Sequence, residues 1–310
     1  MHFPFNFFIQ FLAAAATGPE SLSEAQLIAR YPVLGVATFV LLVVGLLCDL
    51  YLLLRVVRPA LSDSPSAGGT PSLQIDAKPW NMRDLLVSSA LVALLLVGEI
   101  TVALIFQVAH RDVEDALPWL LAMDMALRVA VLFGFVAFFR QRGIDWRRAI
   151  GLRRVAPARA IGFGATCFLA VLPPVFVVIA GYSQFCRLVG IREETQDIVA
   201  SLATSDSMAV VVLIAVFAVV VAPVFEEFLF RGFAYPVLKR RWGALTALMV
   251  VSVAFAAIHF DLSSLAPLFA LAVGLGLAYE LTGSLLTPIT MHALFNTANV
   301  AMILYVRAHS

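Results

Sequence analysis

Apolar stretches of about 20 residues recur along the chain, and they constrain its fold more than any other feature. A stretch of that length is what an α-helix needs to cross a bilayer. Helices satisfy their own backbone hydrogen bonds in lipid, and the stretches lack the alternation of a membrane barrel. The sequence therefore predicts an all-α fold, a polytopic integral membrane helical bundle of about eight transmembrane helices. We expect these spans at roughly 33–57, 84–108, 117–139, 160–184, 208–237, 244–262, 264–281 and 284–306.

The composition excludes a soluble globular class. Of the 310 residues, 62% are hydrophobic and 13% charged, and the mean hydropathy is +0.95. A soluble surface needs roughly a quarter charged residues, so much of the apolar surface must face lipid. The three cysteines, Cys48, Cys167 and Cys186, are far apart and form no C-x-x-C motif. This spacing argues against a disulfide framework or a thiolate metal cluster.

The chain is interpreted as one membrane domain with two parts. Residues 1–30 predict an interfacial or flexible segment, because this apolar stretch lacks the basic region of a signal peptide. Residues 31–199 hold the amino-terminal transmembrane helices, with a flexible loop at 58–81 that is rich in Pro, Ser and Gly. Residues 200–310 hold the remaining helices and most of the polar groups within spans.

Loop charges predict the orientation of the bundle. The loops at 140–159 and 239–241 are basic, whereas those at 110–115 and 192–197 are acidic on balance. With eight spans, both basic loops fall on one side, which the positive-inside rule assigns to the cytoplasm, with both termini outside. The compact loops favour a bacterial protein, so we expect a multi-pass protein of the bacterial inner (plasma) membrane.

Three charged residues in the amino-terminal spans are interpreted as structural. Glu99 stands alone in LLLVGEITVAL, and Asp124 and Arg128 are four residues apart, on one helix face where they can pair. An interior-facing or paired carboxylate often ties helices together, although it can also line a pathway.

Polar residues are more concentrated in the last hundred residues. The fifth span contains VVVAPVFEEFLFRGF, in which Glu226, Glu227 and Arg231 interrupt an apolar run. Each such charge costs several kcal/mol in hydrocarbon, so their presence indicates function. His292 and Asn296 lie on one face of the eighth span, at a depth that the helical rise places close to that of Glu226.

His259 fits this level less well. It lies near the end of the sixth span, about 9 Å further outward by the same rise. Helix tilt or a deeper start of that span would have to bring it to the other residues.

These residue types suit hydrolysis by an activated water. A buried carboxylate beside an imidazole is a proton acceptor, and a second imidazole with an asparagine amide can donate hydrogen bonds to an oxyanion. The same groups can also hold a divalent metal such as Zn²⁺ in an open site. Arg231 follows Glu227 by four residues, so we expect these two to form a buried ion pair that leaves Glu226 available.

The order of three motifs resembles a known family. They lie on successive hydrophobic segments, and the similarity covers roughly residues 200–305. The family is that of the CPBP (Abi) intramembrane proteases, which include the type II CAAX prenyl endopeptidases. The motifs are Glu226-Glu227-x-x-x-Arg231, Phe255-x-x-x-His259 and His292-x-x-x-Asn296.

The resemblance implies an intramembrane endopeptidase with a polar cavity in the bundle. Glu226 and His259 would activate water, and His292 and Asn296 would stabilise the oxyanion. Glu227, Arg231 and Phe255 would support them. A zinc ion held by Glu226, His259 and His292 and a metal-free mechanism both remain open.

The family also implies the partners. The eukaryotic branch removes a C-terminal tripeptide from prenylated proteins, and the bacterial branch includes proteins linked to bacteriocin immunity and maturation. We therefore expect a peptide or protein substrate, with or without a prenylated C-terminus, in contact with the lipid bilayer and without nucleic acid.

Two other functions are compatible with these residues. A proton-coupled transporter could use Glu99, Asp124, Glu226 and the histidines as a relay, although the sequence shows no internal repeat. A non-catalytic family member could instead act in bacteriocin immunity or bind a peptide as a scaffold.

Overall fold

The computed structural model describes residues 32–54, 80–108, 113–191 and 197–309. Within these ranges the chain is helical and contains no β-strand, which confirms the all-α prediction. The expected terminal segment 1–30 and nearly all of the expected loop 58–81 lie outside the described residues.

Eight helical segments follow the predicted spans closely. The first four are α3 (Pro32–Leu52), α5 (Met82–Val108), α6 (Val113–Gln141) and α8 (Pro157–Val189). The fifth is continuous from Met208 to Trp242 but changes its winding: α10 (Met208–Val216), η2 (Phe217–Val221), α11 (Ala222–Glu227), η3 (Phe228–Ala234) and α12 (Tyr235–Trp242). The last three are α13 (Ala244–Ala257), α14 (Leu265–Thr282) and α15 (Leu286–His309). Three short elements complete the set: α7 (Trp146–Ala149), α9 (Asp197–Thr204) and the 3₁₀ turn η4 (Leu262–Ser264).

Six of these segments are long and apolar enough to cross a membrane, among the described residues. They confirm a polytopic integral membrane bundle, but they do not confirm the count of eight. The helix α5 is not among the six, and α13, with 14 residues, is shorter than a full span.

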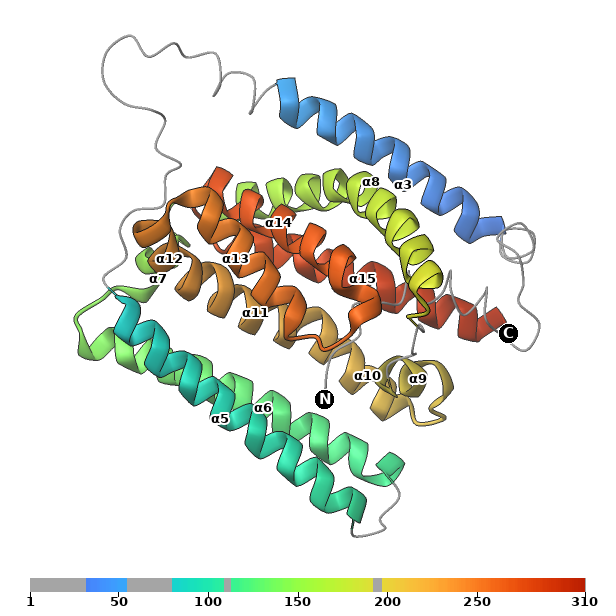
Figure 1. Ribbon diagram of the computed structural model, residues 1–310, viewed down its shortest axis with the longest axis horizontal. Helices are drawn as coiled ribbons and strands as arrows, with labels where there is room; N and C mark the ends of the chain where they lie inside the picture. The colour runs from blue at the N-terminus through green and yellow to red at the C-terminus, as the bar shows by residue number, and fades with distance from the viewer. Residues whose placement is uncertain (1–31, 55–79, 109–112, 192–196, 310) are drawn as a thin grey trace.

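The helices form a packed centre with looser edges (Figure 1). The centre contains α8, the fifth span, α13, α14 and α15, with α3 along one edge and the pair α5 and α6 along the opposite edge. In the apolar stretch of α14 that is long enough to span a membrane, 56% of the residues are buried inside the bundle, compared with 6% in the corresponding stretch of α3. The site residues therefore lie in the part of the molecule that excludes lipid most completely.

Glycines in α14 allow close helix contacts. A Cβ at Gly274 would lie 2.7 Å from Val171 Cγ2 of α8, and one at Gly276 would overlap Leu248 of α13. Contacts that short are not tolerated in a packed interior, so glycine permits the approach of α8 and α13 to α14.

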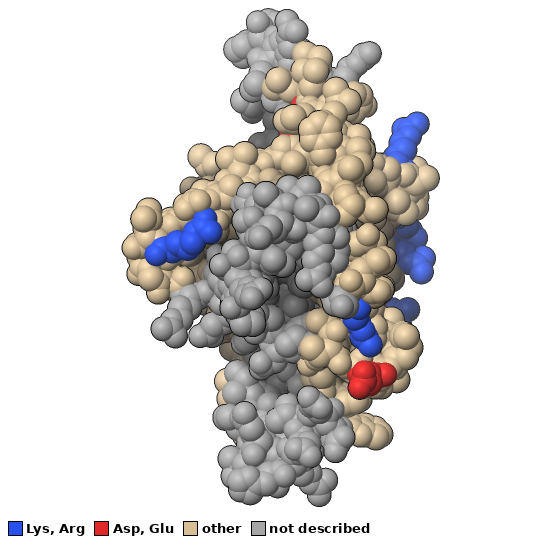
Figure 2. Space-filling view, turned by 90° about the vertical axis from the view of Figure 1, so that its right-hand side faces the viewer, with Lys and Arg blue, Asp and Glu red and all other residues tan. Residues whose placement is uncertain are grey.

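The two ends of the bundle differ in charge. The end where α12 stops contains Lys239, Arg240 and Arg241 in its last turn. Figure 2 shows the opposite end, where α9 and the end of α15 lie, and its described surface is mostly uncharged, with scattered Lys and Arg and some acidic surface.

The fifth span is wound as a π-helix on both sides of Glu226 and Glu227. Each π segment is followed by a proline, Pro223 after η2 and Pro236 after η3. Proline has no N–H and cannot continue the ordinary ladder of hydrogen bonds. Such π segments are frequent at functional sites, and here they flank the two glutamates.

The sixth span ends earlier than predicted. We expected this helix to continue to residue 262, and that prediction is wrong for the last residues because α13 stops at Ala257. Three residues later, Phe260 adopts a positive φ of 48°. Asp261 then accepts hydrogen bonds from Ser263 N and Oγ and begins the turn into α14. A helix of 14 residues is about 21 Å long, less than the roughly 30 Å hydrocarbon core. His259 therefore follows a helix that ends inside the bundle.

The predicted pair on α6 is also present. Arg128 Nε lies 2.8 Å from Asp124 Oδ1, and the guanidinium stacks 5.1 Å and 5.0 Å from the ring centres of Phe217 and Phe225. The pair joins α6 to the fifth span, which supports its structural interpretation. The side chain of Glu99 lies outside the described residues.

Candidate active site

Glu227 and Arg231 form the buried ion pair that their spacing predicted. Arg231 Nη1 lies 2.9 Å from Glu227 Oε1, and the side chains are 1% and 0% exposed. Arg231 Nη2 also donates to the carbonyl of Ala272 on α14, at 2.8 Å. The guanidinium carbon lies 4.7 Å from the ring centre of Phe255, a favourable cation–π distance. The buried charge thus has an anion, a carbonyl and an aromatic face as partners.

His292 lies between the two glutamates. Its Nδ1 is 3.0 Å from Glu227 Oε1, and its Nε2 is 3.9 Å from Glu226 Oε2. Because the Glu227 carboxylate, already bound by Arg231, is an acceptor, Nδ1 carries a proton and donates it there. The hydrogen bond fixes the tautomer and directs Nε2 toward Glu226.

Glu226 is buried but less completely bonded. The residue is 7% exposed, and its Oε2 has no hydrogen-bond partner among the described residues. A buried carboxylate oxygen without a partner indicates a position for a proton donor such as water. Glu226 and Glu227 are adjacent in sequence, yet within the described residues Glu227 alone of the two forms an ion pair with an arginine.

His259 is brought to the same cluster by the early end of α13. Its Nδ1 lies 2.7 Å from the carbonyl of Phe255, so Nδ1–H donates and Nε2 faces away from its own helix. The Phe255 ring lies between the two imidazoles, with ring centres 5.0 Å from His259 and 5.8 Å from His292. Glu226 and His292 are both close enough to act electrostatically on His259. The early end of α13 thus explains why His259 lies close to the other site residues, which the longer predicted span did not explain.

Asn296 lies at the border of this cluster. Its Nδ2 donates to the carbonyl of Ala218 at 2.8 Å, and its Oδ1 has no hydrogen-bond partner in the described parts of the chain. Ala218 needs this donor because the N–H of Ala222 bonds to Phe217, five residues back, and Pro223 has no N–H. Asn296 therefore binds the fifth span with one amide hydrogen and keeps the second for another acceptor.

Sequence reasoning missed the two carbonyls in this site. The carbonyls of Ala218 and Ala272 hold Asn296 and Arg231, and neither alanine stands out in the sequence. The available signal was Pro223, which removes the N–H that would otherwise bond to Ala218 in a π segment.

The expected zinc ligands do not form a metal cluster in this structure. Among the described residues, no group of three His, Cys, Asp or Glu side chains is arranged to hold a metal ion. We therefore derive no chemical step through a metal.

One comparison with known proteins gives a match. The family model Rce1-like, described as type II CAAX prenyl endopeptidase Rce1-like, matches residues 208–298. The matched segment begins with α10 and ends in α15, and it contains all the motif residues above. A search of curated proteins and a search of solved structures found no match.

This match confirms the predicted family resemblance, which rests on less than a third of the chain. Over residues 208–298, the chain is thus similar to the type II CAAX prenyl endopeptidases of the Rce1-like family. The remaining helices carry no part of the match.

Proposed function

We propose that this protein is an intramembrane endopeptidase in which Glu226 is the general base that activates water. The observation that supports the proposal is the difference between two neighbouring carboxylates. Both carboxylates have an Oε2 without a hydrogen-bond partner among the described residues, but Glu227 is bound at Oε1 by Arg231 and His292. Glu226 forms no ion pair with an arginine or lysine in these residues, and its Oε2 lies 3.9 Å from His292 Nε2. A base must have such an oxygen available for a proton.

The reaction begins at Glu226. Its carboxylate, with His259 beside it, takes a proton from water as the water oxygen forms a bond to the carbonyl carbon of the peptide. The carbonyl π electrons move to oxygen and give a tetrahedral oxyanion. When this species collapses, the C–N bond breaks and the proton passes from Glu226 to the leaving amine.

His292 and Asn296 stabilise the oxyanion in this scheme. Glu227 lies 3.0 Å from His292 Nδ1 and stabilises positive charge on the ring, so a protonated His292 can donate from Nε2. The second hydrogen on Asn296 Nδ2 is the other donor. Both groups are 93% or more buried, where a hydrogen bond to a developing charge is strengthened.

The substrate class proposed is a peptide at the membrane, with a prenylated C-terminus as the first candidate. This assignment relies on the Rce1-like match. The proposed location of this protease is the bacterial inner membrane. The transporter and the non-catalytic binder predict no cleavage, so one assay separates them from the protease.

The test uses the purified full chain in detergent, with wild type, Glu226→Ala and His259→Ala. Each protein is incubated with prenylated and unprenylated peptides, and the products are followed by mass spectrometry. We expect cleavage by wild type and a loss of about 100-fold or more in both variants, the usual contribution of a general base. Asp49→Asn on α3 is the matched control, because it removes another carboxylate from a membrane helix.

Equal cleavage by wild type and Glu226→Ala would refute the catalytic assignment. Absence of cleavage by wild type on every peptide would favour the non-catalytic binder. A chelator arm addresses zinc: unchanged cleavage supports the metal-free scheme, and loss that zinc restores replaces it with a metal-dependent one.

A further inference from the structure

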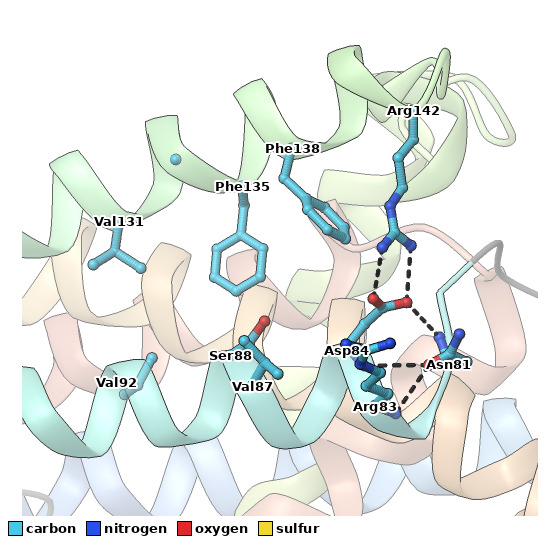
Figure 3. A pocket seen from close by; sticks show the side chains of 11 residues that line it. Asn81, Arg83, Asp84, Val87, Ser88, Val92, Val131, Phe135, Phe138 and Arg142 are labelled. Atoms are coloured by element: carbon cyan, nitrogen blue, oxygen red, sulfur yellow. Dashed lines mark hydrogen bonds and ion pairs between the residues drawn. The ribbon is translucent and has the colours of Figure 1, made fainter.

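A cleft separates α5 and α6 at the basic end of the bundle (Figure 3). Its volume is about 730 Å³, within the roughly 300–1,000 Å³ of small-ligand sites. The two helices make few contacts with each other, and α6 packs on the fifth span more extensively than α5 does. The cleft is distinct from the candidate active site, with which it shares no lining residue.

The cleft is apolar along most of its length. On each helix its lining residues recur at three- and four-residue intervals, so they form one face. From Asp84 to Val92 this face is about 12 Å long. The apolar lining consists of Val87, Val92, Val131, Gly134, Phe135 and Phe138. An alkyl chain matches these dimensions and this polarity.

The two oppositely charged residues at one end of the cleft neutralise each other. Arg142 makes two hydrogen bonds to Asp84, at 2.9 Å and 2.8 Å, and its guanidinium stacks 4.3 Å from the Phe138 ring centre. Figure 3 shows this pair across the mouth of the cleft, beside Asn81. The pair closes one side of the mouth without leaving a net charge.

A second hollow of about 490 Å³ shares Asn81 and Arg83 with the cleft. Arg83 of α5 and Arg240 and Arg241 of α12 line it, and all three are exposed. No ion pair in the described parts of the chain involves these three side chains. By contrast, Lys239 is bound by both oxygens of Glu280, at 2.8 Å and 2.9 Å. Three arginines thus form a cationic group that an external anion can neutralise.

We infer that the cleft and the hollow together bind one anionic phospholipid. The phosphate would lie against Arg83, Arg240 and Arg241, and one acyl chain would lie between α5 and α6. Charge complementarity selects the anionic headgroup, and the continuous apolar face selects a chain over a soluble phosphate. The inference is independent of the proposed protease activity, because it concerns binding alone.

Bound lipid would fill the space between α5 and the rest of the bundle. The back wall of the cleft is Phe135, whose ring centre lies 4.9 Å from those of Phe228 and Phe233 in η3. Trp80, just before α5, donates from Nε1 to the carbonyl of Phe233 at 3.1 Å. The lipid would therefore stabilise contacts to the π segment that contains Arg231.

The test measures lipid binding to the full chain in detergent by native mass spectrometry. The probes are phosphatidylglycerol, phosphatidylcholine and glycerol 3-phosphate, and the variants are Arg240→Gln/Arg241→Gln and Gly134→Leu. Gly134 lines the cleft and no atom lies within 4 Å of its Cβ position, so a leucine there places its side chain toward the space of the acyl chain. Matched controls are Arg148→Gln/Arg159→Gln, from the same basic end, and Gly181→Leu, on an open part of α8.

We expect wild type to bind phosphatidylglycerol in preference to phosphatidylcholine. Removing two arginines should weaken phosphatidylglycerol binding roughly 25-fold, at about fivefold for each arginine near an anionic lipid. Gly134→Leu should also weaken it, the controls should not, and glycerol 3-phosphate should not displace the lipid.

Three results would overturn the inference. Equal binding of both phospholipids would remove the role of the arginines, and displacement by glycerol 3-phosphate would assign the hollow to a soluble phosphate. Displacement of phosphatidylglycerol by a prenylated peptide, with the peptide's affinity lowered by Gly134→Leu, would assign the cleft to a substrate instead.

Discussion

Charged side chains have different surroundings in the packed centre and in the edge helices. In the centre, Glu227 and Arg231 are both fully buried and hold each other across 2.9 Å. At the edge, Asp49 is half-buried on α3, a helix in which 6% of the apolar membrane-spanning stretch is buried. Arg142, which pairs with Asp84, is 44% exposed. A charge inside the centre must have protein partners, whereas one at the edge can reach water or headgroups.

This difference indicates where function lies. The candidate site in the centre holds two carboxylates, two imidazoles and an arginine at a high cost in desolvation, and the family match covers these residues. The edge helices α3 and α5 face lipid with large apolar side chains and carry no matched motif. Substitutions at corresponding residue types in the two regions should therefore have unequal effects.

The largest effect on stability is expected at the buried ion pair. Arg231→Met leaves Glu227 without its cation and should lower the free energy of unfolding by about 3–5 kcal/mol. Thermal unfolding in detergent measures the loss. Arg153→Met is the control, because its pair with Asp145 is 63% exposed on the arginine side and should contribute about 1 kcal/mol or less. Similar losses in both variants would contradict the comparison.

A smaller effect is expected at the π segment. Asn296→Ala leaves the carbonyl of Ala218 unpaired and should cost about 1–3 kcal/mol. Pro223→Ala restores an N–H near that carbonyl, so the cost of Asn296→Ala should be smaller in that background. A double-mutant cycle of unfolding measures the coupling. An unchanged cost would show that proline is not the reason why Ala218 needs the asparagine.

Helix packing gives the third comparison. A Cβ at Gly164 of α8 would lie 2.6 Å from the Thr287 carbonyl oxygen of α15, so Gly164→Ala forces the two backbones apart. We expect a loss of about 1–3 kcal/mol in unfolding experiments. At Gly98 of α5 no atom lies within 4 Å of that position, and Gly98→Ala should be neutral or slightly stabilising. Equal losses would mean that α5 packs as tightly as α8.

The sequence predicted the helices and the polar residues of the centre because both signals are local. Apolar runs mark the helices, and Glu226, Glu227, His292 and Asn296 stand out within such runs. The spacing of Glu227 and Arg231 alone was enough to predict their pair.

Other features depended on backbone geometry, for which Pro223 was the one signal in the sequence. The end of α13 arises from the positive φ of Phe260, and this end brings His259 to the cluster. The role of the Ala218 carbonyl arises from π winding before Pro223. The cleft between α5 and α6 depends on how far apart the two helices lie, which their separate sequences do not specify.

The division of roles between Glu226 and Glu227 is tested most directly by measuring Glu226→Gln and Glu227→Gln side by side, for both kcat/KM and unfolding temperature. We predict that Glu226→Gln loses cleavage by about 100-fold or more with a nearly unchanged unfolding temperature. Glu227→Gln should lower the unfolding temperature, because Arg231 loses its anion. Full cleavage by Glu226→Gln, or an unfolding temperature lowered only in that variant, would contradict the account.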